Sequence, residues 1–491
     1  MANIKSLVKD TAIYGMSSII GRFLNYLLVP LYTNKIAAES GGYGVVTNLY
    51  AYTALIFAIL TFGMETSFFR FANKEGADYR KVFSTSFWVV TTLSVLFLAG
   101  VFGLIGPISS AMGYADHHDY VQIMATIIAL DSIQAVMFSL LRFKKRPYKF
   151  MALKLVFIFL NIGLNLFYFL VLEKTEPYYI FMLNLVCTGL VTFFFVKEFQ
   201  DLRFVFDKKL LRQMLSYSWP ILVLSVAGIL NQTADKILFP FIYDNAETAQ
   251  KELGIYGACV KLAMIMTLIT QAFRYAYEPF VFAQSREKDS KETYALAMKY
   301  FIIVTLLAFL GVVGYMDVLQ HFIGPGYREG LHVVPIVMAA EIFMGISLNL
   351  SIWYKLTDKT IWGAVISITG CAILVALNFI FVPKFGYIAA AWAGAAGYGI
   401  TMTLSYFLGQ KYYPVKYPLK DIAVYIILTA MIFTGMCLVP KDWNLYARMG
   451  VNTLLILVFL IYLYKKDLET SVVPIVKGIK KKFKNKADGK S

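Results

Sequence analysis

The sequence predicts an all-α polytopic membrane protein with about fourteen transmembrane helices, arranged as two pseudo-symmetric six-helix bundles plus two extra C-terminal helices. Three observations lead to this fold class. The 491 residues are 59% hydrophobic and only 15% charged, with a mean hydropathy of +0.64, whereas soluble domains carry roughly 25% charged residues. Apolar runs of about 20 residues, enough to cross a hydrocarbon core of about 30 Å, recur along the chain. The connections between them are short and contain no sizeable soluble domain.

The helices follow in order from these apolar runs. The first run, preceded by Lys5 and Lys9, resembles a secretory signal, but it is long, lacks a small-residue cleavage site and is followed at once by another run, so we expect it to remain. The first seven helices are expected at Thr11–Thr33, Val45–Phe69, Ser84–Ile108, Tyr120–Leu141, Phe150–Leu172, Tyr178–Val196 and Tyr217–Ile242. The others are expected at Ile255–Pro279, Tyr300–Leu319, Val333–Tyr354, Trp362–Val382, Tyr387–Leu408, Ile422–Leu438 and Arg448–Tyr464.

The distribution of charge predicts the orientation in the membrane. The net charge of +16 would indicate nucleic-acid binding in a soluble protein. Here Lys and Arg gather at the N-terminus and in alternate loops, at residues 70–81, 142–149, 197–212 and 286–299, and in the tail. Basic loops stay in the cytoplasm, so both termini are expected there and no nucleic-acid partner is expected.

An internal repeat relates the first and seventh helices. Residues 21–30 align with residues 231–240 at an offset of 210, and after the following loop the offset is 213. The equivalent pairs at this second offset are Tyr43 and Tyr256, Gly44 and Gly257, Glu65 and Glu278, and Phe69 and Phe282. Copies separated by six crossings have the same orientation, which predicts two bundles related by an axis along the membrane normal, with a cavity between them.

The repeat and the helix order divide the chain into four parts. We expect a six-helix bundle in residues 1–200, a second bundle in residues 201–412, helices 13 and 14 in residues 413–466, and a basic cytoplasmic tail in residues 467–491. The tail mixes lysines with apolar side chains, a composition that favours contact with anionic lipids of the inner leaflet.

The 6+6+2 pattern resembles a known family, as do the segments Thr233-Ala234-Asp235-Lys236-Ile237-Leu238 and Leu253-Gly254-Ile255-Tyr256-Gly257. The chain is similar over nearly its whole length to the polysaccharide-transporter (O-antigen flippase) branch of the multidrug/oligosaccharidyl-lipid/polysaccharide exporter superfamily. The resemblance implies a flippase of the bacterial cytoplasmic (inner) membrane that moves undecaprenyl-diphosphate-linked oligosaccharide outward by alternating access, for surface polysaccharide such as lipopolysaccharide. It further implies membrane lipids and glycan polymerase machinery as partners. The family has no strict catalytic signature, so the site residues rest on physical reasoning.

Ionisable residues inside the predicted helices are the candidate site. Each costs about 2.5–3.5 kcal/mol at mid-membrane, so it should face the protein interior or a watery cavity. Arg22 lies near the middle of helix 1, and its repeat counterpart is the polar stretch of helix 7. Cations from several helices could bind the oxygens of a diphosphate. The candidate cavity residues are Arg22, Asn25, Asp235, Lys236 and Arg274. The alternative is interhelical ion pairs, for example of Arg22 or Lys236 with Asp131 or Asp235, without a ligand.

Two further groups of residues have less specific signals. Helix 2 ends in Glu65 and Arg70, and helix 8 carries Glu278 at the equivalent level, so these three residues form either a cytoplasmic gate or plain interfacial ion pairs. The carboxylates that could take a Na⁺ or H⁺ coupling ion are Asp235, Glu341 and Asp131. Neither another cofactor nor a metal is expected, since CxxC, HExxH, phosphate-loop and GxSxG motifs do not occur.

Several functions compete with the oligosaccharide flippase. A lipid II flippase belongs to the same class. A multidrug cation antiporter would need acidic groups where helix 1 offers Arg22. A polytopic glycan polymerase or ligase would be an enzyme, but such enzymes carry a large outer loop, which the sequence does not contain. A structural or receptor protein would not explain a repeated polar cavity. We therefore expect a transporter and not an enzyme.

Overall fold

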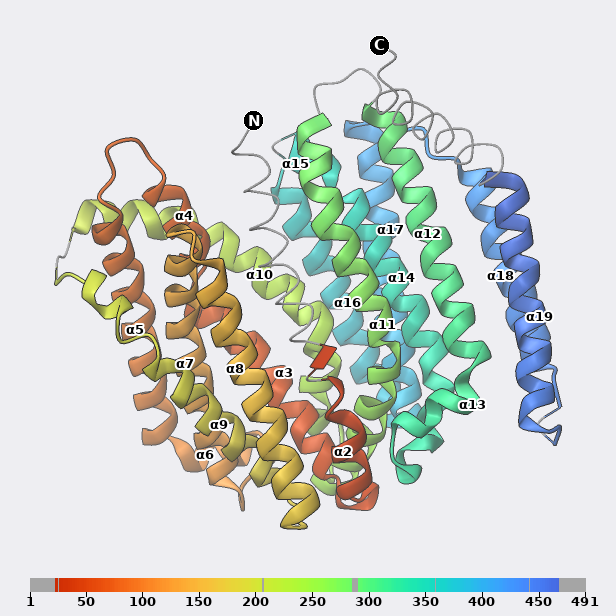
Figure 1. The fold of residues 1–491 in the computed structure, drawn as a ribbon, viewed down its shortest axis with the longest axis horizontal. Coiled ribbons are helices and arrows are strands. Elements are labelled where there is room, and N and C mark those ends of the chain that lie inside the picture. The colour runs from red at the N-terminus through yellow and green to blue at the C-terminus, as the bar shows by residue number, and fades with distance from the viewer. Residues whose placement is uncertain are drawn as a thin grey trace, which may run out of the picture. The chain divides into compact units, whose positions relative to one another are not determined.

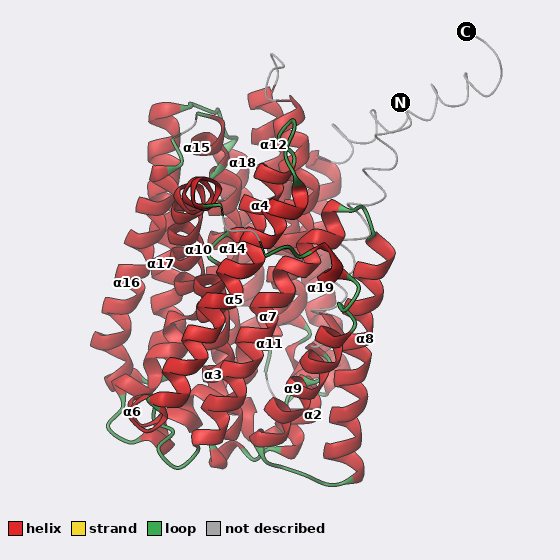
Figure 2. Ribbon diagram, turned by 90° about the vertical axis from the view of Figure 1, so that its left-hand side faces the viewer, coloured by secondary structure: helices red, strands yellow, loops and turns green. Residues whose placement is uncertain are grey.

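The computed structural model describes residues 23–24, 26–204, 207–284, 290–357, 359–440 and 442–467. All regular elements within these ranges are helical (Figure 2). Eleven helical stretches of the described chain are long and apolar enough to cross a membrane. The protein is therefore an all-α, multi-pass membrane protein, as its composition predicts.

Two groups of helices form the larger of two compact units, which comprises Met1–Ser285 and Phe322–Pro414. The first group contains α2 (Val29–Lys35), α3 (Gly42–Thr61), α4 (Met64–Ala72), α5 (Tyr79–Gly103), α6 (Ile105–Ala111), α7 (His118–Phe143), α8 (Pro147–Leu166) and α9 (Pro177–Phe193). The second group contains α10 (Lys208–Ile242), α11 (Ala246–Gln284), α14 (Val334–Leu350), α15 (Ile352–Leu356), α16 (Ile361–Phe385) and α17 (Tyr387–Tyr412). Helix α10 runs obliquely between the groups and packs on α3, α4 and α16 (Figure 1).

The smaller unit contains α12 (Ser290–Gly314), α13 (Met316–Leu319), α18 (Leu419–Cys437) and α19 (Leu445–Leu463). A buried polar cluster joins its helices. Lys299 of α12 pairs with Asp467 and lies 3.2 Å from Asp421 Oδ2, and the Tyr425 hydroxyl donates to Asp467 at 2.5 Å. Helix α12 thus packs with α18 and α19. The four-part division of the chain, which places this helix in residues 201–412, stays a prediction.

The predicted helices can be compared with the observed ones from Val45 onward. Together with α9 and α17, the eleven apolar stretches coincide with every predicted helix after the first. The first predicted helix, Thr11–Thr33, lies largely outside the described residues. The count of fourteen therefore stays a prediction.

The second predicted helix, Val45–Phe69, is broken between α3 and α4. Phe62 and Gly63 have φ values of 49° and 66°, in the left-handed region that ends a helix. Gly63 also allows α10 to pass closely, because a Cβ there would lie 3.3 Å from the carbonyl oxygen of Ser218. Helix α4 therefore begins a new direction beside α10.

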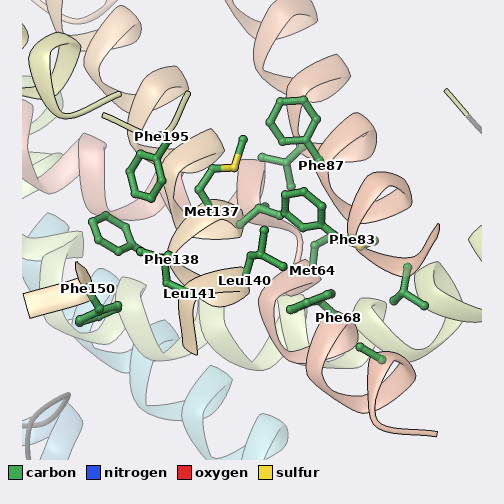
Figure 3. Close-up of a cluster of buried hydrophobic side chains, with 14 of the residues drawn as sticks. Met64, Phe68, Phe83, Phe87, Met137, Phe138, Leu140, Leu141, Phe150 and Phe195 are labelled. Carbon is green, nitrogen blue, oxygen red and sulfur yellow. The ribbon is translucent and has the colours of Figure 1, made fainter. Parts of the chain in front are cut away.

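A cluster of apolar side chains forms the core of the first helix group (Figure 3). Phe68 of α4 is fully buried and packs edge-on against Phe83 of α5, with the ring centroids 6.0 Å apart. The rings of Phe138 of α7 and Phe150 of α8 make a similar contact at 5.0 Å. Because lipid tails are as apolar as these side chains, close packing and ring geometry stabilise the group more than exclusion of water does.

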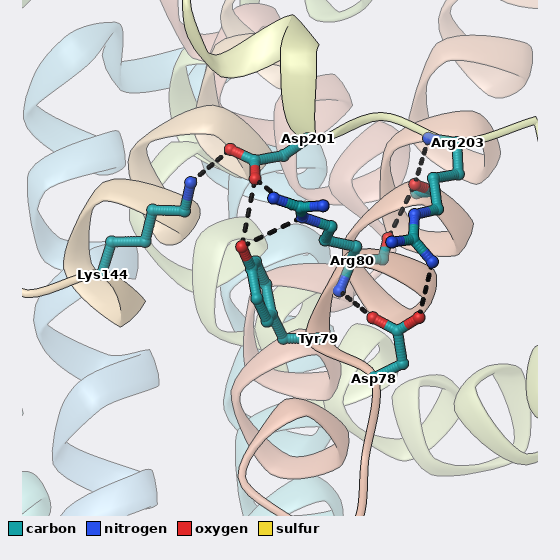
Figure 4. A network of polar contacts seen from close by, with 7 residues as sticks. Asp78, Tyr79, Arg80, Lys144, Asp201 and Arg203 are labelled. Atoms are coloured by element: carbon teal, nitrogen blue, oxygen red, sulfur yellow. Dashed lines mark hydrogen bonds and ion pairs between the residues drawn. The ribbon is translucent and has the colours of Figure 1, made fainter.

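A polar network ties the loops at one end of this group together (Figure 4). Asp201, in the short helix η3 (Glu198–Asp201), accepts a hydrogen bond from the Tyr79 hydroxyl at 3.1 Å. It also pairs with Lys144 and lies 3.3 Å from Arg80 Nε. Burial opposes ionisation of this carboxyl, but the hydrogen bonds from Lys144 and Tyr79 and the nearby positive charges outweigh burial, so the pKa of Asp201 is below its usual value.

Candidate functional site

A cavity of about 570 Å³ lies between the two helix groups of the larger unit. Residues of α2, α3, α8 and α9 line it from the first group, and residues of α10, α11, α14, α16 and α17 line it from the second. Its walls combine apolar side chains with tyrosines, threonines and amides. They also carry two lysines, Lys236 and Lys261, and two carboxylates, Asp235 and Glu341. A hollow of this size and mixture suits a polar ligand held inside a membrane.

The charged pair of α10 is compensated locally. Both carboxylate oxygens of Asp235 lie 2.9 Å from Lys236 Nζ, and the Tyr256 hydroxyl of α11 donates to Asp235 Oδ2 at 2.8 Å. Lys236 Nζ also donates to the Gln232 carbonyl oxygen at 3.1 Å. A buried carboxylate with a cationic and a hydroxyl donor is well satisfied, so this pair both lines the cavity and joins α10 to α11.

A buried polar link fixes the same turn of α10 to the first helix group. Asn48 of α3 donates from Nδ2 to the Lys236 carbonyl oxygen at 2.7 Å, and the Tyr114 hydroxyl donates to Asn48 Oδ1 at 2.8 Å. Asn48 is fully buried. The hydrogen bonds therefore determine which turn of α10 faces α3, and they place Lys236 where the two groups meet.

Lys261 is the less compensated of the two cavity lysines. It lies on α11, one turn beyond Gly257, and within the described ranges it pairs with no carboxylate. Glu341 of α14 instead accepts a hydrogen bond from the Thr267 hydroxyl at 3.0 Å. Lys261 thus offers a positive charge to an anionic ligand.

Amide side chains on the cavity wall offer hydrogen bonds to a neutral ligand. Asn231 donates from Nδ2 to the Ser367 carbonyl oxygen at 2.7 Å, whereas its buried Oδ1 has no hydrogen-bond partner among the described residues. Asn184 of α9 donates to the Tyr50 hydroxyl at 2.8 Å. Amide and phenol groups of this kind can exchange these bonds for those of ligand hydroxyl groups.

Backbones of the two groups meet closely at the end of the cavity where α3 and α11 begin. A Cβ added to Gly44 of α3 would lie 1.8 Å from the Gln250 carbonyl oxygen, and one added to Gly257 of α11 would lie 2.4 Å from Thr47 Oγ1. Gly44 and Gly257 are equivalent in the internal repeat. Because these two residues have no side chain, α3 and α11 approach each other closely at both positions. The close contacts shut this end of the cavity.

Contacts around η5 (Pro325–Val333) extend this closure. The Tyr327 hydroxyl donates to the Ile36 carbonyl oxygen at 3.0 Å, and the Gly324 amide donates to Thr33 Oγ1 at 3.0 Å. Gly324 also leaves room for the Thr33 carbonyl oxygen, which would lie 1.9 Å from an added Cβ. The short segment before α14 is therefore hydrogen-bonded to the end of α2.

The structure brings only some of the predicted cavity residues together. Asp235 and Lys236 line the cavity beside each other. Arg274 is exposed near the far end of α11 and is not among the lining residues of this cavity. Arg22 and Asn25 lie outside the described residues, so their place in the cavity stays a prediction.

The predicted gate residues have separate surroundings. Glu65 accepts a hydrogen bond from Arg142 Nη2 at 2.9 Å, an ion pair within the first helix group. The Arg70 guanidinium lies over the Tyr217 ring, 4.0 Å from its centre. The side chain of Glu278 lies outside the described part of the structure. These contacts of Glu65 and Arg70 do not join the two side chains, and the three-residue gate stays a prediction.

The predicted coupling carboxylates divide between two places. Asp235 and Glu341 line the cavity, whereas Asp131 of α7 lies within the first helix group, where Thr188 Oγ1 donates to it at 3.4 Å. Lys154 of α8 lies 4.0 Å from the centre of the Phe138 ring. Asp131 therefore lies apart from the cavity, beside α9, and its role as a coupling carboxylate stays a prediction.

Several cavity residues were not among the sequence candidates. Lys261 could have been found from its charge inside an apolar helix, the same signal that identified Lys236. Tyr256 is a weaker case, since it is recognisable only through its repeat partner Tyr43. Asn184 and Asn231 gave no specific signal, because asparagines in membrane helices mostly bind helix to helix.

Comparisons with known proteins agree with this architecture. Residues 7–276 match the model of a family described as polysaccharide biosynthesis proteins. Protein 1 of the Lsg locus of Haemophilus influenzae is 21% identical over 420 residues, covering 82% of this chain and 98% of that protein. The lipid II flippase MurJ in an inward closed conformation is similar in structure, with a TM-score of 0.73, 14% identity and coverage of 92% of this chain and 98% of that one. An inward-facing MATE multidrug transporter has a TM-score of 0.64 at 14% identity, covering 79% and 93%.

Proposed function

This chain belongs to the family of polysaccharide biosynthesis proteins, and from that premise we propose that it is a flippase that moves a polyprenyl-diphosphate-linked oligosaccharide across the bacterial cytoplasmic membrane. It is a multi-pass membrane protein with the fold of a lipid flippase and of multidrug transporters. The observation that carries the proposal is the cavity between the two helix groups, in which Lys261 faces a ligand space without a carboxylate partner among the described residues.

The cavity supplies binding groups for both polar parts of such a lipid. A diphosphate carries about two negative charges, and an ammonium group that lacks a carboxylate partner in a membrane attracts them strongly. Amide and hydroxyl groups such as Asn184, Asn231 and Tyr50 match sugar hydroxyls. The polyprenyl chain needs no polar site and can remain in the bilayer. The chain's own residues therefore bind and screen the headgroup, and no bond is broken.

Alternating access follows from the closure of one end. Basic loops predict that α3 and α11 begin on the outer side of the membrane, so the glycine contacts between them close the cavity toward the outside. If these contacts separated while the two helix groups approached each other at the cytoplasmic end, the same cavity would open to the outside. The duplicated arrangement favours a rocking motion about the axis between the bundles.

A coupling ion has one well-placed candidate ligand. Glu341 faces the cavity and has a single hydroxyl donor, Thr267, whereas Asp235 is already engaged by Lys236 and Tyr256. We therefore assign coupling, by H⁺ or Na⁺, to Glu341 first. The variant Glu341→Gln should then export glycan at a rate that no longer depends on the ion gradient.

The central experiment compares two variants of Lys261 in cells that lack the native gene. Lys261→Gln should reduce export of surface glycan about tenfold or more, because a hydrogen bond to a charged group contributes about 1.5–3 kcal/mol, and lipid-linked glycan should accumulate in the inner leaflet. Lys261→Arg keeps the charge and should retain most of the export. Lys145→Gln removes an exposed loop cation and serves as the control.

Two results would contradict the proposal. One is normal export by Lys261→Gln at normal membrane abundance. The other is efflux of cationic dyes by the wild-type protein, lost in Glu341→Gln, with no effect of either variant on surface glycan. The second result would favour the multidrug antiporter.

A further inference from the structure

A second cavity of the larger unit, with a volume of about 860 Å³, lies where α4 ends and α10 begins. Five cationic side chains line it: Arg70 from the last turn of α4, Lys74 from the loop that follows it, and Lys208, Lys209 and Arg212 from the start of α10. The described residues that line it include no Asp or Glu. It shares no lining residue with the central cavity.

Six neighbouring cations at this end of the first helix group form ion pairs with four carboxylates. The ion pairs are Arg80 and Lys144 with Asp201, Arg146 and Lys149 with Glu198, Arg203 with Asp78, and Lys81 with Asp207. In the described part of the chain, the five cations of the second cavity form no such pair. The absence of acids is therefore a property of this cavity and not of the whole surface.

Aromatic rings hold two of these cations in position. The Arg70 guanidinium lies 4.0 Å from the centre of the Tyr217 ring, and Lys74 Nζ lies 4.1 Å from the centre of the Phe71 ring. The two rings pack edge-on at 6.2 Å. A cation–π contact leaves the N–H groups of the cation available, whereas a carboxylate would occupy them. The cations are thus held in place with free hydrogen-bonding capacity for an anion.

The cavity lies at the level of lipid headgroups. Its cations come from residues 70–81 and from residues 197–212, two of the basic stretches that the charge distribution predicts at the cytoplasmic face. They therefore lie in the polar interface and not in the hydrocarbon core. Trp219 follows two residues after Tyr217 and is exposed, as expected of an aromatic side chain at a membrane boundary.

We propose that this cavity binds a membrane lipid of the cytoplasmic leaflet whose headgroup carries two phosphates. Like charges gathered in one hollow repel, and an anion relieves that repulsion. Five cations exceed the need of a single phosphate, and basic pockets between helices on the cytoplasmic side bind such headgroups. The site does not depend on what the central cavity transports.

The test uses the full-length protein in phosphatidylcholine nanodiscs and measures binding of fluorescent cardiolipin, a lipid with two phosphates. The double variant Lys209→Gln with Arg212→Gln removes two exposed cations from the cavity. We expect it to bind cardiolipin roughly tenfold or more weakly than the wild type. The matched control, Lys145→Gln with Lys197→Gln, removes the same charge from loops at the same end of the helix group and should bind as the wild type does.

Three outcomes would overturn the proposal. Equal cardiolipin binding by all three proteins would exclude the cavity as the site. Equal affinity for phosphatidylglycerol, which has one phosphate, would exclude the requirement for two. Binding of inorganic pyrophosphate without binding of cardiolipin would identify a soluble phosphate compound as the occupant. Monodisperse elution and an unchanged unfolding midpoint show that the double variant is folded.

Discussion

Asp235 is the residue on which the polar wall of α10 depends. It binds Lys236 through both oxygens and accepts a hydrogen bond from Tyr256, and its side chain is 7% exposed. Removal of one partner from a buried ion pair leaves an uncompensated charge, which costs about 3–5 kcal/mol. We expect Asp235→Asn to lower the free energy of unfolding by about 3 kcal/mol in detergent.

A double-mutant cycle separates the interaction energy of the Asp235–Lys236 ion pair from the other effects of replacing each side chain. Lys236→Gln in the Asp235→Asn background should recover part of the lost stability, because no charge is then left unpaired. Tyr256→Phe removes only a hydroxyl donor and should cost about 1 kcal/mol. Strictly additive losses in the double variant would show that the two charges do not interact.

The lowered pKa of Asp201 predicts how the free energy of unfolding depends on pH. This pKa is lower in the folded protein than in the unfolded chain, so the unfolded state binds more protons as the pH falls. The stabilisation is therefore fully present above the usual Asp pKa of about 4 and is lost as the pH falls through the lower folded value. The unfolding midpoint should decline below about pH 4, and Asp201→Asn should flatten that decline. A variant that kept the wild-type slope would assign the effect to other carboxylates.

Some single residues of the cavity can be recognised from the sequence alone. Charge inside an apolar helix identified Lys236 and Asp235 without any structure, because the cost of burial restricts such groups to polar surroundings. The sequence could not show that adjacent residues would pair with each other and not with Asp131 on another helix. That outcome depends on side-chain directions, which follow from the packing of α10 on α11.

Helices α3 and α11 contact each other through their backbones, and a larger side chain at this contact should separate the two helices. Valine at Gly44 would overlap with the backbone of Gln250. Cys259 of α11 is buried and donates to the Tyr327 carbonyl oxygen at 3.3 Å, so its thiol reports on this region. In a protein without the other three cysteines, Gly44→Val should increase the rate of maleimide labelling of Cys259 several-fold.

The control for this experiment is Gly189→Val on α9, where an added Cβ meets no atom within 4 Å. It should leave the labelling rate of Cys259 unchanged. Slow labelling of Gly44→Val would mean that the helices accommodate the side chain without separating.

The packing of the first helix group predicts that replacing two phenylalanines by alanine will change the free energy of unfolding unequally. Phe68 of α4 is fully buried among aromatic rings, whereas Phe159 of α8 is 62% exposed. Phe68→Ala should cost about 3 kcal/mol of unfolding free energy through the cavity it leaves. Phe159→Ala should change it by less than about 0.5 kcal/mol. Equal effects in thermal or denaturant unfolding would contradict the assigned packing.

Hydropathy alone does not predict where every helix begins and ends. A run of apolar residues predicted one helix at Val45–Phe69, but Phe62 and Gly63 divide it into α3 and α4. The break is invisible to composition because both halves are apolar. It depends on the passage of α10 beside Gly63, a contact between residues far apart in the chain. Asp78 and Asp207, in contrast, are N-cap residues of a kind that sequence alone can identify.

At the scale of the whole chain, composition predicted the all-α membrane fold and the repeat predicted the relation between the helix groups. Gly44 and Gly257, paired by a constant offset in the sequence, contact opposite helices in the structure. The grouping of α12 with α18 and α19 had no sequence signal. The cluster of Lys299 with Asp421 and Asp467 joins these helices in the folded chain.

The charges of the central cavity have an electrical consequence. Within the described residues they cancel, since Lys236 and Lys261 balance Asp235 and Glu341. Counting these four side chains alone, with no ion on Glu341, a carrier loaded with a diphosphate would move about two negative charges outward and return neutral. An inside-negative voltage drives such a current forward, by about 2.3 kcal/mol per charge for each 100 mV. Voltage alone would then favour export, and collapsing it with an ionophore should slow glycan delivery even where ion gradients are clamped.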